Sequence, residues 1–313
     1  MKTFEHIDAK TVNEAVSALG AKAKIIAGGT DLLYTLKDEI LPDYPETVVN
    51  IKTIPNMDYV KEEGDMLKIG ALALLADIAN NTTVKSKYTA LAEAAGRVAS
   101  PNIREMGTIG GNLCQLARCW YYRNPNNRFF CFRKGGPLCL AVAGENRYHA
   151  ILGGAVCFAV CPSDTAIALT ALDATVVTNK RSIAIGDFYE VLGNTLDNNE
   201  IVTEVQVPTP ASGTKQTFTK FALRKSIDFA IVSVASAITI EAGKVSDARI
   251  VLGAVAPVPY RATGAEAAIA GKAINEANAE AAGTAAVSGN IALEANKYKV
   301  QIAKTLVKRA ILA

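Results

Sequence analysis

The six cysteines constrain the fold more than any other feature, because all of them lie between Cys114 and Cys161 of a 313-residue chain. A disulfide framework normally spreads its bridges through a small secreted protein, and a reducing cytosol would not keep them formed. One or two buried thiols would need no explanation beyond packing, since free cysteine behaves as a small apolar residue. A cluster of this density favours metal ligation. We call residues 114–161 the cysteine loop.

The spacing within the cysteine loop favours an iron–sulfur cluster over zinc. Structural zinc sites usually bring their ligands in pairs about two to four residues apart. Only Cys157 and Cys161 are that close, whereas wide gaps separate Cys119, Cys131 and Cys139. Four thiolates around an open loop suit a cubane cluster, in which each iron takes one thiolate and inorganic sulfide supplies the remaining ligands. Zinc remains the alternative.

Charge and hydropathy exclude several partners. The net charge is only +3, and the basic residues are scattered rather than gathered on one face, so nucleic acid and anionic membrane are not expected partners. The first residues lack the apolar core of a signal peptide, and no apolar run reaches the roughly 18 residues that a spanning helix requires. We therefore expect a cytoplasmic location.

Two glycine-rich segments carry a pattern typical of anion binding. The apolar run 23–27 predicts a buried strand, Gly28 and Gly29 predict a tight turn, and Thr30 or Asp31 can cap the following helix. We call residues 28–31 the first glycine bend. Such a turn can surround a pyrophosphate with backbone N–H groups, but it also occurs without a ligand and is neither a Walker loop nor the dinucleotide fingerprint.

The second glycine bend, residues 106–115, has the sequence "MGTIGGNLCQ" and repeats this chemistry. Two such bends in one domain could clasp one extended cofactor from two sides. Elsewhere, Thr11 and Glu14 predict a capping box for a helix that ends at Gly20. Segments 229–240 and 247–257 predict strands. The last helix is expected to bury one face, formed by Tyr298, Ile302, Leu306, Val307 and Ala310.

Five motifs in order carry a family resemblance: "AGGTDLL", "TIGGNL", "PSDTAIAL", "DFAIVSVA" and "GAVAPVPYRA". Together they resemble the FAD-binding medium subunit of the molybdenum hydroxylases, the xanthine dehydrogenase and carbon monoxide dehydrogenase family. The resemblance implies an α+β fold. An FAD-binding domain of the vanillyl-alcohol oxidase type would occupy residues 1–177, with lobes at about 1–54 and 55–177, and a smaller α+β domain of the CO dehydrogenase flavoprotein type would occupy 178–313.

The resemblance also implies the FAD contacts. The pyrophosphate and ribose would be held by Lys24, Ile25, Ile26, Ala27, Gly28, Gly29, Thr30, Asp31 and Leu32, and the second cradle by Thr108, Gly111 and Asn112. Asp164 matches an acidic FAD contact, although it also suits the N-cap of the next helix. Ile201 and Val202 match a segment near the flavin but also read as plain strand. Lys220 matches a lysine near the flavin ring, where a solvated strand lysine is the simpler account.

The cysteine loop resembles a subgroup with an additional [4Fe-4S] cluster, represented by the 4-hydroxybenzoyl-CoA reductase β subunit and the periplasmic aldehyde oxidoreductase FAD subunit. Three ligands of both match Cys119, Cys131 and Cys139. The fourth falls at Tyr148 in the reductase pattern, which cannot serve, and at Cys157 in the other, with Cys161 in reserve. Cys114 is expected to pack, and His6 and His149 are expected to be structural. Several basic residues could offset the negative charge of a cluster or grip an acidic partner: Arg118, Arg123, Arg128, Arg133 and Lys134.

The expected function is electron transfer without a catalytic side chain. The resemblance implies an oxidoreductase complex with a molybdenum cofactor-binding large subunit and a [2Fe-2S] small subunit, with ferredoxin or NAD(P) as the external partner. Two alternatives stay open. The chain could be a stand-alone NAD(P)H-linked flavin diaphorase, or a non-catalytic interaction subunit with a cysteine-bound zinc.

Overall fold

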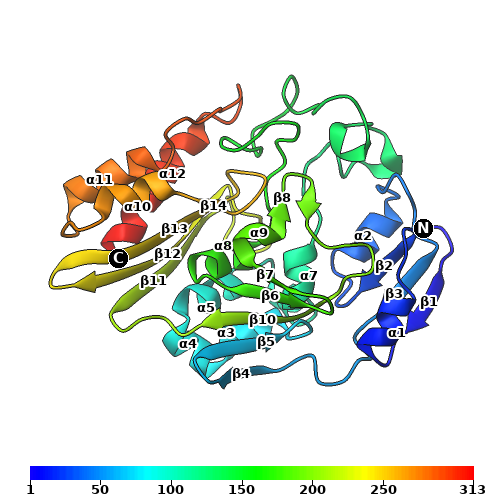
Figure 1. Cartoon of the computed structure of the whole chain (residues 1–313). Helices are drawn as coiled ribbons and strands as arrows, with labels where there is room; N and C mark the ends of the chain where they lie inside the picture. The colour runs from blue at the N-terminus through cyan, green and yellow to red at the C-terminus, as the bar shows by residue number, and fades with distance from the viewer.

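The computed structural model describes residues 1–313 and begins with a three-stranded parallel sheet (Figure 1). The strand order is β1-β3-β2, and Val49 of β3 is aligned with Ile7 on one side and Ile25 on the other. Thr11 caps the first helix, since its Oγ1 accepts a hydrogen bond from the Glu14 backbone N–H at 3.1 Å. The predicted strand at 23–27 and the Thr11 cap are confirmed. The helix ends at Ser17 rather than at Gly20, and the Glu14 carboxylate accepts from Lys10 N–H instead of completing the capping box. The bounds are β1 Glu5–Asp8, α1 Val12–Ser17, β2 Ala23–Ile26, α2 Leu32–Lys37 and β3 Thr47–Asn50.

A five-stranded antiparallel sheet of order β4-β5-β10-β6-β7 forms the second lobe. Its strands are β4 Val60–Glu63, β5 Met66–Gly70, β6 Thr175–Thr178, β7 Ser182–Ala184 and β10 Val202–Pro208. The central strand β10 is bonded to β5 on one side and β6 on the other. This sheet therefore takes its middle strand from beyond residue 177, where the sequence placed the end of the first domain.

Six helices accompany this sheet: α3 Leu75–Asn80, α4 Thr82–Lys87, α5 Thr89–Gly96, α6 Pro101–Arg104, α7 Ile109–Cys114 and α8 Asp164–Ala171. Every residue of α8 is buried, because the helix lies between α5 and the sheet of the C-terminal domain. Its neighbours there are small or flat side chains, such as Ala90 and Ala94 of α5 and Ala235 of β12. Close backbone approach follows from this composition.

The C-terminal domain is a four-stranded antiparallel sheet, β11-β12-β13-β14, with helices on both faces. Its elements are β11 Thr214–Phe221, β12 Val232–Glu241, β13 Lys244–Gly253, β14 Tyr260–Arg261, α10 Thr263–Ile269, α11 Glu276–Ala285 and α12 Tyr298–Leu312. Val234 faces the core under α10–α12, and the adjacent Ala235 faces α5 and α8. Burial on both faces explains the nearly continuous apolar run that predicted this strand.

The buried face of α12 begins one residue later than predicted. Leu306, Val307 and Ala310 are buried as expected, but Tyr298 is 41% exposed. Lys299 is fully buried instead, and its Nζ donates to the backbone oxygens of Tyr148, His149 and Ala254 at 3.4, 2.9 and 2.5 Å. A buried ammonium is tolerated there because three carbonyl groups accept its hydrogen bonds.

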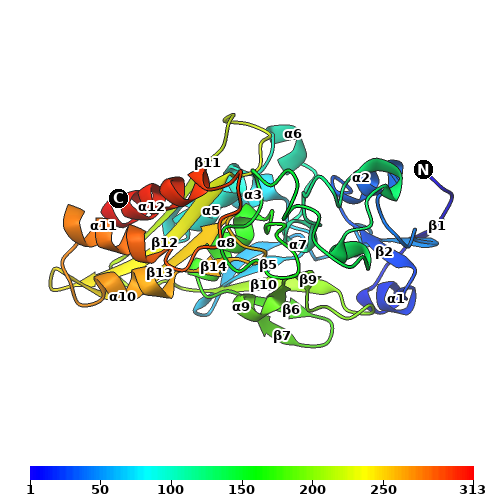
Figure 2. The ribbon, with the colours of Figure 1, turned by 90° about the horizontal axis from the view of Figure 1, so that it is seen from above.

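The cysteine loop connects α7 to α8 and contains two short 3₁₀ turns, η1 Pro125–Asn127 and η2 Phe132–Lys134. Three separate parts of the chain hold it: Asn126 N–H donates to Asp38 O, Arg133 Nη2 to Val191 O and Ile151 N–H to Val255 O, each at 2.8 Å. The loop thus lies between the first sheet and the C-terminal domain (Figure 2). Val191 belongs to a small hairpin near its base, and the elements there are α9 Ile185–Phe188, β8 Tyr189–Glu190 and β9 Gly193–Asn194. None of the helices in the chain is both long and apolar enough to cross a membrane.

Candidate functional site

The two glycine bends touch each other. A Cβ atom added to Gly28 would lie 1.9 Å from the backbone oxygen of Met106, so only glycine allows this approach. Gly29 has a φ of +72°, which L-residues with side chains rarely adopt. In the second bend, Thr108 Oγ1 accepts a hydrogen bond from Gly111 N–H at 3.2 Å and caps α7. Two segments that the sequence analysis identified separately therefore form one surface.

Asp31 connects the first glycine bend to the cysteine loop. It stands at the N-cap position of α2, but its side chain makes no capping hydrogen bond, so this part of the prediction was wrong. Its carboxylate instead accepts from Leu116 N–H at 2.9 Å, Arg123 Nη2 at 2.7 Å and Arg118 Nη1 at 2.9 Å. Burial lowers the pKa of Arg118 to about 10 despite the opposing charge of Asp31. The remaining predicted residues of 24–32 are half-buried or exposed along β2 and the bend.

Asn112 joins the second glycine bend to the start of α8. Its Oδ1 accepts hydrogen bonds from Ser163 Oγ and Thr165 Oγ1, both at 2.6 Å. Ser163 also caps α8 by accepting from Ala166 N–H at 3.1 Å. The capping role considered for Asp164 was therefore wrong, because the residue before it already occupies the N-cap.

Asp164 and Lys220, which the resemblance implied separately, form a buried ion pair across the two domains. Their charged atoms are 2.7 Å apart, and their side chains are 8% and 6% exposed. Lys220 Nζ also donates to Arg97 O at 3.0 Å. Burial raises the pKa of Asp164, while Lys220 and Arg97 oppose that shift. Lys220 is thus a buried partner of Asp164 rather than a solvated strand lysine.

A small pocket lies beside Asp164 at the junction of the domains. Its lining includes Arg118, Ser163, Phe229 and Ser233. The Ser233 hydroxyl is buried without a hydrogen-bond partner, and the Arg118 guanidinium lies 4.8 Å from the centre of the Phe229 ring. A polar ligand group would satisfy the hydroxyl.

Ile201 and Val202 are buried in the core of the five-stranded sheet rather than exposed at the bends. One residue links their strand to the second bend. Ala71 O accepts from Gly110 N–H at 2.9 Å, and Ala71 N–H donates to Thr203 O at 3.0 Å. Ile201 and Val202 are therefore connected to the second glycine bend through the backbone hydrogen bonds of Ala71.

Replacing Lys220 by methionine is expected to destabilise the chain by about 3–5 kcal/mol, because an uncompensated carboxylate would remain buried at Asp164. Urea unfolding followed by circular dichroism measures the change. Lys215→Met on the same strand, where the side chain is exposed, is the matched control and should change little. The double variant Lys220→Met with Asp164→Asn should recover part of the loss. Equal stability of the single variant and the wild type would contradict the structural role of the pair.

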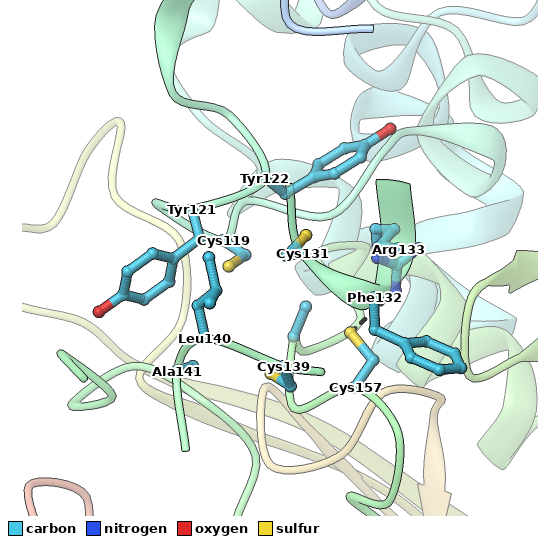
Figure 3. A pocket seen from close by; sticks show the side chains of 11 residues that line it. Cys119, Tyr121, Tyr122, Cys131, Phe132, Arg133, Cys139, Leu140, Ala141 and Cys157 are labelled. Atoms are coloured by element: carbon cyan, nitrogen blue, oxygen red, sulfur yellow. Dashed lines mark hydrogen bonds between the residues drawn. The ribbon is translucent and has the colours of Figure 1, made fainter. Parts of the chain in front are cut away.

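Four of the six cysteines line a second cavity, in the cysteine loop. Figure 3 shows the sulfur atoms of Cys119, Cys131, Cys139 and Cys157 directed toward the same space. All six cysteines are free thiols. No three Cys, His, Asp or Glu side chains converge closely enough to hold a single metal ion. The thiolates of a cubane bind different irons, so they stand farther apart than the ligands of one ion.

The two remaining cysteines lie elsewhere. Cys161 belongs to the main hydrophobic core, and Cys114 packs against it. Burial raises the pKa of each of these thiols to about 12. Cys157, rather than the reserve residue Cys161, lines the cavity. A hydrogen bond from Cys139 and the charge of Arg133 lower the pKa of Cys157 to about 5 although burial opposes them.

Nitrogen groups of three side chains surround the cysteines. Arg133 Nη2 lies 3.7 Å from Cys157 Sγ, and the Lys134 ammonium is buried beside Cys131 without any hydrogen-bond partner. His149 Nε2 lies 3.2 Å from Cys119 Sγ. His149 was expected to be structural because it has no metal-ligand spacing with His6, the only other histidine. A buried cation without a partner is costly, and an anionic group in this cavity would remove that cost.

Comparison with known proteins identifies the family. The family described as "FAD binding domain in molybdopterin dehydrogenase" matches residues 2–119 and 136–210, and "CO dehydrogenase flavoprotein C-terminal domain" matches residues 217–313. The chain belongs to the FAD-binding medium subunits of the molybdenum hydroxylases. The family predicted from the five motifs, the fold class, the oxidoreductase assignment and the FAD-binding domain are confirmed.

Individual relatives of this FAD-binding subunit support the same family assignment. It is 35% identical over 285 residues, 85% of its length and 86% of the other protein, to the aldehyde oxidoreductase FAD-binding subunit PaoB of Escherichia coli K12. It is 30% identical to the carbon monoxide dehydrogenase medium chain of Hydrogenophaga pseudoflava, with 99% and 96% of the two chains covered. The solved carbon monoxide dehydrogenase structure from that organism superimposes with a TM-score of 0.80 at 29% identity, covering 100% of this chain and 97% of the other.

Proposed function

We propose that this subunit carries both FAD and a [4Fe-4S] cluster and transfers electrons within a molybdenum hydroxylase or dehydrogenase complex. The observation that carries the proposal is the cavity lined by Cys119, Cys131, Cys139 and Cys157, with an unpartnered buried Lys134 ammonium beside it. The family match supports it further, because it is interrupted between residues 119 and 136. Residues 120–135, which include Cys131 and Lys134, lie outside the matched ranges.

We infer that the contacting glycine bends hold the FAD pyrophosphate. Residues 24–32 would approach it from one side, and Thr108, Gly111 and Asn112 from the other. The Asp164–Lys220 pair, the adjacent cavity and the segment Ile201–Val202 would then lie on the flavin side. Bound FAD supplies the conversion between one-electron and two-electron transfer. The role of this chain is to position it and to exclude water.

The four cysteines are proposed to ligate the cluster, which supplies one-electron transfer when bound. Arg133 and Lys134 would offset its negative charge, and the aromatic rings of Tyr121 and Tyr122 line the same cavity. The donor set is all thiolate, as clusters of this type require. Lys134 would then no longer be a cation without a counter-charge.

We propose a molybdenum cofactor-binding large subunit and a [2Fe-2S] small subunit as partners. The organic substrate would be bound by another subunit. Ferredoxin or NAD(P) would exchange electrons with this subunit. A cytoplasmic location is proposed because it keeps the thiols reduced. The domain boundary is proposed to lie between β10 and β11, at residues 209–213, rather than at 177, because β10 is bonded on both sides within the first domain.

The visible absorption spectrum of the anaerobically purified full chain tests this function. We expect flavin bands together with the broad iron–sulfur absorption, and about four irons per chain. Flavin bands without iron would favour the diaphorase. A colourless protein that contains zinc would favour the interaction subunit.

A further inference from the structure

The imidazole of His149 contacts one proposed cluster ligand. Its Nε2 lies 3.2 Å from Cys119 Sγ, whereas its buried Nδ1 has no hydrogen-bond partner. A ligating thiolate has no proton to donate, so the ring nitrogen must be the donor in this contact. His149 would then carry its proton on Nε2.

The position of His149 is fixed from the C-terminal domain. Its backbone oxygen accepts from Asn296 Nδ2 at 3.2 Å and from Lys299 Nζ at 2.9 Å. Its backbone N–H donates to Asn146 O at 2.9 Å. The residue is buried, with 5% exposed, and its ring centre lies 6.4 Å from that of Tyr121. The donor is therefore held in one place rather than free to turn into solvent.

We propose that His149 donates a hydrogen bond to the sulfur of Cys119 and thereby raises the reduction potential of the [4Fe-4S] cluster. This inference rests on the proposed function. The cysteine sulfurs carry more negative charge in the reduced state, so a hydrogen bond to sulfur stabilises that state more than the oxidised one. His149 is a positioning and tuning residue, because Cys119 stands between it and the iron.

The other nitrogen groups act differently. Arg133 contacts Cys157 at the longer distance of 3.7 Å and also donates to Val191 O at 2.8 Å, so its position is shared. The Lys134 ammonium has no hydrogen-bond partner and contributes its charge. His149 is thus the group whose removal deletes one defined hydrogen bond to sulfur with no change in formal charge when the ring is neutral.

The test is an EPR-monitored redox titration of the anaerobically purified full chain. His149→Leu removes the donor at similar volume and should lower the ratio of reduced to oxidised cluster at a fixed solution potential about tenfold, which is about 59 mV for one electron. His149→Gln should keep most of the wild-type ratio, because its terminal amide can donate from the same place. His6→Leu, an exposed histidine, is the matched control and should leave the ratio unchanged.

Iron content distinguishes a failure of the proposed function from a failure of the inference about His149. If the wild type contains no cluster, the proposed function fails. If His149→Leu keeps its iron and its wild-type potential, only the inference about His149 is overturned. If that variant fails to assemble a cluster, the His6→Leu chain decides, because ¹⁵N-histidine then labels His149 alone. Pulsed EPR of its reduced cluster should then show coupling to ¹⁵N, and absence of that coupling overturns the inference.

Discussion

Replacing Cys131 by serine is expected to remove the iron–sulfur absorption and most of the iron while leaving FAD bound. Cys131 is 6% exposed and lines the cavity with three other cysteines, so a serine hydroxyl would face the iron in place of a thiolate. Iron–sulfur clusters are held by thiolates, and a neutral hydroxyl is a poor substitute. Iron and acid-labile sulfide analysis, with the visible spectrum of the same sample, measures both outcomes.

Cys114→Ser is the matched control for this experiment. Cys114 is also a free cysteine but packs against the main core outside the cavity. Its replacement should leave the iron content at the wild-type level. A full iron complement in Cys131→Ser would refute the ligand assignment, and equal iron loss in both variants would indicate a general folding defect.

Replacing Gly28 by alanine is expected to abolish most FAD binding. The added Cβ would lie 1.9 Å from Met106 O and 2.7 Å from Met106 C, both backbone atoms that cannot rotate away. The two glycine bends must separate to accommodate it, at a cost of at least about 1–3 kcal/mol for overpacking. The ratio of FAD to protein after desalting and the thermal midpoint of the apo chain are the measurements.

Gly20→Ala is the appropriate control, because nothing lies within 4 Å of a Cβ built there. It should bind FAD as the wild type does. A Gly28→Ala chain that retained a full complement of FAD would contradict the proposal that the contact between the bends forms the cofactor cradle.

Local sequence signals predicted local structure well. The Thr11 cap and the strand before Gly28 depend on neighbouring residues, and such preferences act over a single turn. The contact between Gly28 and Met106 joins residues far apart in sequence, so no local pattern contains it. The only sign of this contact in the sequence is Gly28 itself, and a glycine required by a close contact looks the same as any other turn glycine.

The other contacts that the sequence did not predict also join residues far apart in the chain. Asp31 pairs with Arg118 and Arg123 instead of capping α2, because the half-buried Arg118 and the buried Arg123 guanidinium groups compete for its carboxylate. Nothing in the sequence around Asp31 specifies those partners. Likewise, the contact of His149 with Cys119 depends on the C-terminal domain holding its backbone. Ser163 is the one feature that the local sequence could have predicted. A serine directly before Asp164 is itself a strong N-cap.

The central position of β10 shows why domain limits are hard to infer. Its sequence predicts a strand but not its neighbours, and pairing with β5 and β6 is decided by which edges the rest of the fold leaves open. The predicted boundary at residue 177 therefore falls inside β6 of the five-stranded sheet.

The attachment of the cysteine loop to three distant parts of the chain bears on the order of biogenesis. Ile151 N–H and Ile151 O are bonded to Val255 O and Ile291 N–H, and the His149 carbonyl is bonded to Asn296 and Lys299. During synthesis the cysteines leave the ribosome long before those residues exist. Iron delivery to the proposed cluster site would therefore be post-translational.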